Sequence, residues 1–244
     1  MPAPANHPPS PGVESLSVFF PCYNEQDNLR RVYESATKVL GRQGLDYEII
    51  LVDDGSTDQT PQIANAIAVT NPRVTVVRHA ANLGYGAALQ SGIRAATKAL
   101  VFYTDGDGQF DLNELPPLLP LMKEFDIVSC FRRNRQEGRI RKLNSWCWTC
   151  LVCLLFRLKL KDINCAFKLF KRRVFEGMEL RSAGALINAE ILARATRRGY
   201  AIGQVGVHHF PRLRGRPTGA NLHVIFRAFR ELVKLYWQIN RSNR

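Results

Sequence analysis

No run of apolar residues in the sequence is long enough for a membrane-spanning helix, which takes about 20 residues. Residues 1–14 are rich in proline and lack the apolar core of a secretory signal, so we expect a disordered tail and no signal peptide. The six cysteines lie in apolar surroundings rather than between short loops. We therefore expect free thiols in a cytoplasmic protein.

Acidic side chains are scarce in two parts of the chain. Residues 132–173 hold 13 basic and two acidic residues, and residues 212–244 hold eight basic residues and one acidic residue. Residues 1–131, in contrast, hold 15 acidic and nine basic residues. The formal net charge of +13 is thus concentrated in two segments. This pattern favours a localised anionic partner, such as a substrate or a membrane surface, and we expect no nucleic-acid partner.

Apolar, strand-like runs alternate with segments of helical periodicity between residues 16 and 131. The alternation predicts βαβ units, and hence an α/β fold with a mainly parallel central sheet flanked by helices. An apolar fraction of 45% and a charged fraction of 23% are ordinary for a folded domain and exclude wholesale disorder. The predicted strands cover 16–20, 48–52, 74–77, 100–103 and 127–131, and the predicted helices cover 28–40, 61–69, 85–97 and 112–124.

Three polar clusters directly follow predicted strands, at residues 21–25, 53–58 and 105–109. In an open parallel sheet the carboxyl ends of the strands meet at one edge, and ligands bind beyond that edge. Asp105 and Asp107, with a glycine between them, can ligate one Mg²⁺ or Mn²⁺ ion, and Gln109 could add an amide oxygen. The alternative is an ordinary polar turn, because Asp-Gly pairs are common in turns.

Two further segments leave alternatives open. Residues 53–58 could bind a base or ribose, or could cap the helix predicted near residue 61. Residues 82–86 (Asn-Leu-Gly-Tyr-Gly) could cradle a phosphate, but a lone Gly-x-Gly is unspecific. We favour the start of a closely packed helix for this segment.

The ordered motifs PCYNE, EIILVDDGSTD, NLGYGAALQSGI and DGDGQ resemble those of the family 2 glycosyltransferases, which have the GT-A fold. Within that family the chain is most similar to the polyprenyl-phosphate sugar transferases of the dolichyl-phosphate mannose or glucose synthase type. The resemblance implies a GT-A domain over 15–219, followed by a helix over 220–244. It also implies a nucleotide pocket and a diphosphate bound through a metal ion. The residues that would bind the nucleotide are Pro21, Tyr23, Glu25, Asp53 and Asp54. The residues that would bind Mg²⁺ or Mn²⁺ are Asp105, Asp107 and Gln109, and Asp107 would also be catalytic.

The second half of the chain resembles the same subfamily. Residues 162–169 are similar to its Asp-x-x-Ser-Gly-Phe-Arg-Leu stretch, and residues 187–190 to a segment that ends in an acidic residue, here Glu190. Residues 212–215 are similar to an Arg-x-x-Gly loop that usually continues into Ser-Lys. This chain has no lysine there, so Arg212, with Arg214 or Arg216, would contact the acceptor phosphate. Of His208 and His209, we expect one to line the pocket and one to be structural.

A phosphate acceptor fits the charge pattern. A phosphate monoester is already an anionic nucleophile near pH 7, so the protein needs cations near it rather than a general base. We expect at least one of Arg132, Arg133 and Arg139 to meet a substrate phosphate, with Arg132 as the catalytic candidate. A solvated basic loop is the alternative.

Two helical segments could meet a membrane. The apolar run 146–156 has a basic rim and suits an interfacial helix, although a buried core helix is an equal alternative. Residues 220–244 alternate apolar and basic faces, which predicts a basic amphipathic helix on an anionic membrane surface or, alternatively, a helix docked on the core.

The leading hypothesis is a metal-dependent enzyme that moves a hexose, with inversion, from a UDP- or GDP-sugar to a polyprenyl phosphate. It would act at the cytoplasmic membrane face as a peripheral protein. The first alternative is a transferase of the same fold with a saccharide or other soluble acceptor, in which Glu190 or another carboxylate would be the general base. The second is a non-catalytic module that docks on membrane or nucleic acid through the basic segments.

Overall fold

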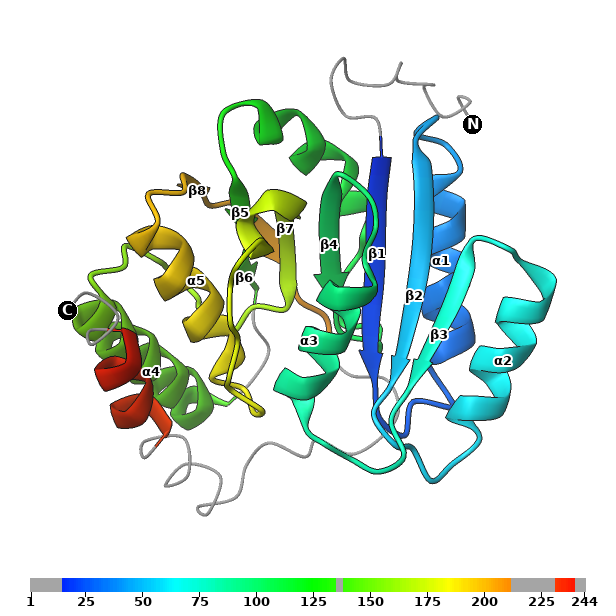
Figure 1. Cartoon of the computed structure of the whole chain (residues 1–244), viewed down its shortest axis with the longest axis horizontal. Coiled ribbons are helices and arrows are strands. Elements are labelled where there is room, and N and C mark those ends of the chain that lie inside the picture. The colour runs from blue at the N-terminus through cyan, green and yellow to red at the C-terminus, as the bar shows by residue number, and fades with distance from the viewer. Residues whose placement is uncertain (1–14, 135–137, 212–230, 240–244) are drawn as a thin grey trace.

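The structure is a computed structural model that describes residues 15–134, 138–211 and 231–239, with only the helical backbone described for residues 139–141. A seven-stranded sheet forms its centre (Figure 1). In spatial order the strands are β3 (Val74–Arg78), β2 (Asp46–Asp53), β1 (Ser15–Cys22), β4 (Leu100–Thr104), β7 (Phe167–Lys171), β5 (Ile127–Ser129) and β8 (Ile202–Gly203). Only β7 runs antiparallel to its neighbours, β4 and β5.

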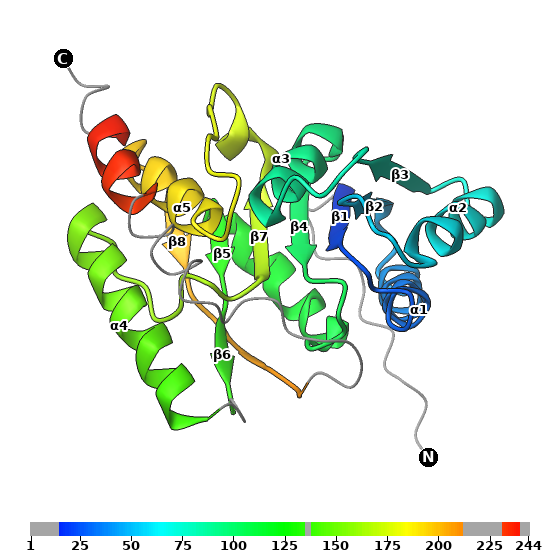
Figure 2. The same cartoon turned by 90° about the horizontal axis from the view of Figure 1, so that it is seen from below.

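Helices cover both faces of this sheet, as Figure 2 shows with α1 on one side and α3 and α5 on the other. The predicted α/β class and mainly parallel sheet are therefore confirmed. The helices are α1 (Leu29–Leu40), α2 (Thr60–Thr70), α3 (Tyr85–Ala95), α4 (Arg139–Phe156) and α5 (Ile187–Arg197), and a two-stranded sheet pairs β6 (Phe131–Arg133) with β9 (Gly206–His208).

The strands divide their side chains between two hydrophobic cores because successive residues of a strand point to opposite faces. In β1, Val18 and Phe20 pack with α1 and α2, whereas Phe19 packs with α3. The same alternation places Phe102 in the first core and Tyr103 in the second. Both faces of the central strands are thus buried, and the polar residues of the site lie at the strand ends.

Two predicted elements differ from the structure. The segment predicted as one helix over 112–124 forms two 3₁₀ helices, η1 (Leu112–Glu114) and η2 (Pro116–Lys123), because Pro116, Pro117 and Pro120 cannot donate the hydrogen bonds of an α-helix. The strand predicted over 127–131 ends at Ser129. Phe131 instead begins β6, in the smaller sheet.

The described part of the C-terminal segment is helical from residue 231 to residue 239, and it is drawn in red in Figures 1 and 2. Leu232, Leu235 and Ile239 are buried in the same core as α5, and the rings of Tyr236 and Phe156 lie 6.2 Å apart. This piece docks on the core, as the alternative interpretation predicts. None of the helices within the described ranges is both long and apolar enough to cross a membrane.

Candidate active site

Unpartnered polar atoms gather at the carboxyl edge of the large sheet. Among the described residues, five buried side-chain oxygens have no hydrogen-bond partner: Asp53 Oδ2, Tyr85 OH, Thr104 Oγ1, Asp105 Oδ1 and Ser129 Oγ. Asp53, Thr104 and Ser129 end β2, β4 and β5, Asp105 follows β4, and Tyr85 begins α3. Buried polar groups are normally hydrogen-bonded, and two of these five residues, Tyr85 and Asp105, line one cavity at this edge, which favours a site for a polar ligand.

A cavity of about 630 Å³ opens at this edge, and we call it the edge cavity. It lies between the turn after β4 and the start of α3. Its lining consists of Pro21, Cys22, Tyr23, Asn24, Glu25, Asp54, Asn82, Gly84, Tyr85, Ala88, Asp105, Gly106 and Asp107. The polar clusters 21–25, 53–58 and 105–109 therefore meet around one cavity, and residues 82–88 close it from the α3 side.

Asp105 and Asp107 form the acidic end of the edge cavity. Burial and the neighbouring Asp107 raise the pKa of Asp105 to about 7. Asp107 is also nearly buried, and its Oδ1 accepts a hydrogen bond of 3.0 Å from the backbone N–H of Gln109. Two close carboxylates repel each other, and a divalent cation between them would remove that cost.

Gln109 connects this turn to Phe210, in the segment that follows β9. Its side-chain Nε2 donates to the carbonyl of Phe210 over 2.9 Å, and its carbonyl accepts from the N–H of Phe210. The carbonyl oxygen of the Gln109 side chain is not used in these bonds. Gln109 follows the two carboxylates in the same turn but is not among the residues that line the edge cavity, and its role as a metal ligand stays a prediction.

The donor set fits Mg²⁺ or Mn²⁺, although the described residues contain no preformed cluster of three His, Cys, Asp or Glu side chains around a metal position. Asp105 Oδ1 is a buried, orphaned carboxylate oxygen, and Asp107 is next to it. Mg²⁺ is commonly held by one or two carboxylates together with the phosphates of a substrate. Asp105 and Asp107 would therefore hold the ion, and a bound diphosphate would complete its coordination.

Asp54 lines the edge cavity, but its carboxylate is used within the protein. Oδ1 accepts from Leu83 N, Oδ2 accepts from Gly84 N, and the Nδ1 of His79 lies 2.7 Å from Oδ1. His79 Nε2 is 2.9 Å from Ser91 Oγ on α3. Asp54 therefore fixes the 83–84 turn. Sequence reasoning missed His79, whose only signal is a polar residue directly after a strand.

The 21–25 loop borders the edge cavity, and Asp53 ends the neighbouring strand β2 outside the cavity lining. Asp53 is buried and accepts from Ser56 N, and its Oδ2 is 3.3 Å from Arg78 Nε without a hydrogen bond. Tyr23 is exposed, while Glu25 is buried and accepts from Asn28 Nδ2 over 2.8 Å. Of the residues predicted to bind the nucleotide, Pro21, Tyr23, Glu25 and Asp54 line the cavity, and Asp53 does not.

The predicted acceptor arginines have different surroundings. Arg132 forms a two-pronged ion pair with the buried Asp162, with Nε 2.7 Å from Oδ2 and Nη2 3.1 Å from Oδ1. Arg133 is exposed, and no hydrogen-bond acceptor for its guanidinium is found among the described residues. Arg139 begins α4, its side chain lies outside the described part, and Arg212 and Arg216 lie outside the described residues altogether.

Glu190 is completely buried on α5, away from the lining of the edge cavity. Its carboxylate accepts from Arg181 N and Ser182 N and pairs with Arg194, whose Nη2 is 2.8 Å from Oε1. The general-base role of Glu190 stays an untested prediction. In the structure the oxygens of this carboxylate already accept hydrogen bonds from backbone N–H groups.

The remaining sequence expectations can also be located. His208 is exposed and pairs with Glu114, whereas His209 is nearly buried and packs edge-on against Phe110 beside the Asp105–Gln109 turn. Gly84 has a φ of 98° and precedes α3, which confirms a closely packed helix start at 82–86.

Sequence reasoning missed Lys168, which is completely buried and donates to the carbonyls of Ile163 and Cys165. Burial lowers the pKa of its ammonium.

The chain resembles curated proteins over most of its length. It is 31% identical over 171 residues to the dodecaprenyl-phosphate galacturonate synthase of Rhizobium johnstonii, a match that covers 68% of this chain and 50% of that protein. It is 30% identical over 218 residues to the undecaprenyl-phosphate 4-deoxy-4-formamido-L-arabinose transferase of Aeromonas hydrophila, covering 87% of this chain and 65% of the relative. The chain thus spans one half to two thirds of these relatives.

Solved structures share the fold. Glucosyl-3-phosphoglycerate synthase of Mycobacterium tuberculosis, crystallised with Mn²⁺, uridine diphosphate and glucosyl-3-phosphoglycerate, superposes with a TM-score of 0.69 over 93% of this chain and 80% of its own, at 22% identity. A second crystal structure of that enzyme, with Mg²⁺ and uridine diphosphate, gives a TM-score of 0.67. Residues 17–178 match the family described as Glycosyl transferase family 2, and they include all four of the motifs named above. The chain therefore belongs to that family.

Proposed function

We propose that the protein transfers a sugar from a nucleoside-diphosphate sugar to a polyprenyl phosphate, with Mg²⁺ or Mn²⁺ as cofactor. The observation that carries this proposal is the edge cavity, with a paired Asp105 and Asp107 at one end and the 21–25 loop at the other. Relatives named as transferases to dodecaprenyl and undecaprenyl phosphate support the acceptor class. The donor nucleotide, UDP or GDP, is left to the assay.

The donor would lie along the edge cavity. Pro21, Tyr23 and Glu25 would border the nucleoside, with Asp53 behind them, and Asp105, Asp107 and Gln109 would hold the metal ion. When bound, that ion neutralises the diphosphate as it leaves. The start of α3 closes the cavity from the other side, where Asp54 holds the 83–84 turn in place.

The acceptor phosphate would attack the anomeric carbon without a general base, because it is already ionised near pH 7. What the chain must supply is positive charge at the place where two anionic substrates meet. Arg133 is exposed on β6 and has no acceptor within the described ranges, so its guanidinium can take an incoming phosphate. Arg132, held by its ion pair with Asp162, would add a second positive charge near the phosphate. Arg139, Arg212 and Arg216 stay predicted contacts of the acceptor phosphate.

The test is a transfer assay with the purified protein. Radiolabelled UDP- and GDP-sugars are incubated with Mn²⁺ or Mg²⁺, with and without undecaprenyl or dolichyl phosphate. We expect label in the organic phase only when the lipid phosphate is present. Label that moves only to a water-soluble acceptor would favour the soluble-acceptor transferase, and no transfer to either acceptor would contradict the proposal.

One face of α4 suits an anionic membrane surface. Thr149 and Val152 face the core, whereas a stripe along the helix is exposed and includes Leu143, Trp146, Cys147, Cys150 and Leu154. Residues 138–161 contain no acidic side chain, and the exposed basic residues around the stripe are Lys142, Arg157, Lys159 and Lys161. An apolar stripe with a basic rim favours an interfacial position, so we propose peripheral binding to the cytoplasmic face of a membrane.

The double variant Trp146→Ser, Leu154→Ser should bind phosphatidylglycerol vesicles at least tenfold more weakly, because each side chain contributes about 1.5–3 kcal/mol when it leaves water. Co-sedimentation with vesicles is the measurement. Val69→Ser, which removes an exposed side chain from α2, is the control and should bind as the wild type does. Unchanged binding by the double variant would exclude this face of α4.

A further inference from the structure

A segment of backbone, residues 181–184, lies directly against the start of α3. The N–H of Gly86 donates to the carbonyl of Ala183 over 2.7 Å, and the side chain of Gln90 donates to the carbonyl of Ser182 over 3.1 Å. A Cβ atom on Gly86 would lie only 2.3 Å from the Ser182 oxygen. The two backbones therefore touch without a side chain between them, and the position of one determines the position of the other.

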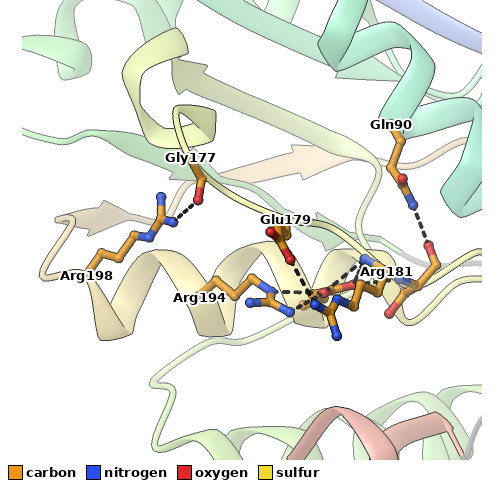
Figure 3. Close-up of polar contacts among 8 residues, drawn as sticks. Gln90, Gly177, Glu179, Arg181, Arg194 and Arg198 are labelled. Atoms are coloured by element: carbon orange, nitrogen blue, oxygen red, sulfur yellow. Dashed lines mark hydrogen bonds and ion pairs between the residues drawn. The ribbon is translucent and has the colours of Figure 1, made fainter. Parts of the chain in front are cut away.

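The other side of this segment is held by Glu190. Oε2 accepts from Ser182 N over 2.8 Å and from Arg181 N over 3.0 Å, and Oε1 accepts from Arg194 Nε over 2.9 Å. Figure 3 shows Arg194 and Arg181 converging on this point, with Gln90 reaching the same segment from α3. Arg194 is one helical turn after Glu190 and balances its buried charge.

The start of α3 is a wall of the edge cavity, to which Gly84, Tyr85 and Ala88 contribute. On the cavity side, Asp54 holds this turn through Leu83 N and Gly84 N. On the far side, only a thin layer of backbone, Ser182 and Ala183, separates the turn from Glu190. A displacement of residues 181–184 would therefore move the wall.

We propose that Glu190 and Arg194 form a positioning pair that holds residues 181–184 against α3 and so fixes the α3 wall of the edge cavity. The inference rests on the proposed function in one respect, that the edge cavity binds a nucleoside diphosphate. It gives Glu190 a different task from that of a general base. A base needs a free lone pair within reach of the acceptor proton, and the Glu190 carboxylate is buried and already bonded to N–H donors.

The experiment compares Glu190→Gln with Glu179→Gln, a matched control on an exposed side chain two residues before Arg181. Titration calorimetry with UDP and with GDP, each with Mn²⁺, measures donor-site affinity without an acceptor. We expect Glu190→Gln to bind at least tenfold more weakly, about 1.4 kcal/mol, and the control to bind as the wild type does. Amide hydrogen exchange on the nucleotide-free protein should rise at both 84–88 and 181–184 in Glu190→Gln alone.

Two results would overturn the inference. One is unchanged nucleotide affinity and unchanged exchange in Glu190→Gln. The other is a Glu190→Gln variant with unchanged nucleotide affinity whose kcat falls about 10³-fold and whose pH–rate profile loses one limb. That result would identify Glu190 as an acid–base group. If Glu190→Gln does not fold, Arg194→Lys, which keeps the charge but not the planar fork, should change affinity and exchange in the same direction. A wild type that binds neither nucleotide would contradict the proposed function, and the exchange data would still decide the positioning role.

Discussion

Asp107→Ala is expected to lower sugar transfer by at least about 10³-fold, because electrostatic stabilisation at the leaving diphosphate is among the largest contributions to such a reaction. The side chain of Asp107 accepts a bond from Gln109 N within its own turn, so its removal should leave the rest of the fold intact. Turnover, Mn²⁺ binding and the thermal unfolding midpoint would be measured together.

The control for this variant is Asp46→Ala. Asp46 begins β2 at the opposite end of the sheet, is mostly exposed and pairs with Lys98. We expect Asp46→Ala to keep both turnover and Mn²⁺ binding. Near-normal turnover in Asp107→Ala, with the same dependence on Mn²⁺, would refute the metal assignment.

Gly86→Ala is expected to destabilise the protein by about 2–3 kcal/mol, as overpacking of a tight contact does, and to weaken UDP binding. Helix propensity alone predicts the opposite sign, since alanine is about 1 kcal/mol better than glycine inside a helix. The added Cβ would meet Ser182 O at 2.3 Å and the Ala183 carbonyl carbon at 2.7 Å, and both are backbone atoms that cannot rotate away. Urea unfolding and UDP titration measure the two effects.

Gly138→Ala serves as the comparison, because a Cβ at that position meets no atom within 4 Å. We expect it to change neither stability nor UDP affinity. If Gly86→Ala is as stable as the wild type, the contact between α3 and residues 181–184 is looser than the structure shows.

Much of the fold follows from local patterns in the sequence. Each central strand is a short apolar run, and a polar cluster marks its carboxyl end, so both the sheet and its functional edge are predictable from residues such as Asp53 and Asp105. The prediction of one α-helix over 112–124 was wrong. It rested on the spacing of apolar residues, which takes no account of the N–H groups that three prolines lack. The apolar run 146–156 has one face in the core and one face exposed, so the alternative of a buried core helix holds for one face only, and the interfacial position of the other face stays a prediction.

The side-chain partnerships of the site could not be predicted in the same way. Asp162 pairs with Arg132 across 30 residues, and Asp54 reaches the N–H groups of residues 83 and 84 across a strand and its loop. Sequence motifs indicate that an acidic residue matters but not which donors it meets. Glu190 illustrates the point, because its position in a motif suggests chemistry, while its contacts with Arg181 N and Ser182 N are set by tertiary packing.

The order of strands in the sheet has a consequence for synthesis of the chain. In the described part of the chain, β1, β2 and β3 pair only with strands inside residues 15–104, as does one edge of β4, and the described residues that line the edge cavity come from 21–107. β5, in contrast, pairs only with β7 and β8, so it must wait for residues 167–171. On the ribosome, where N-terminal parts fold first, the half that carries the edge cavity can assemble early. β4 then keeps an open edge, a template for aggregation, until β7 pairs with it.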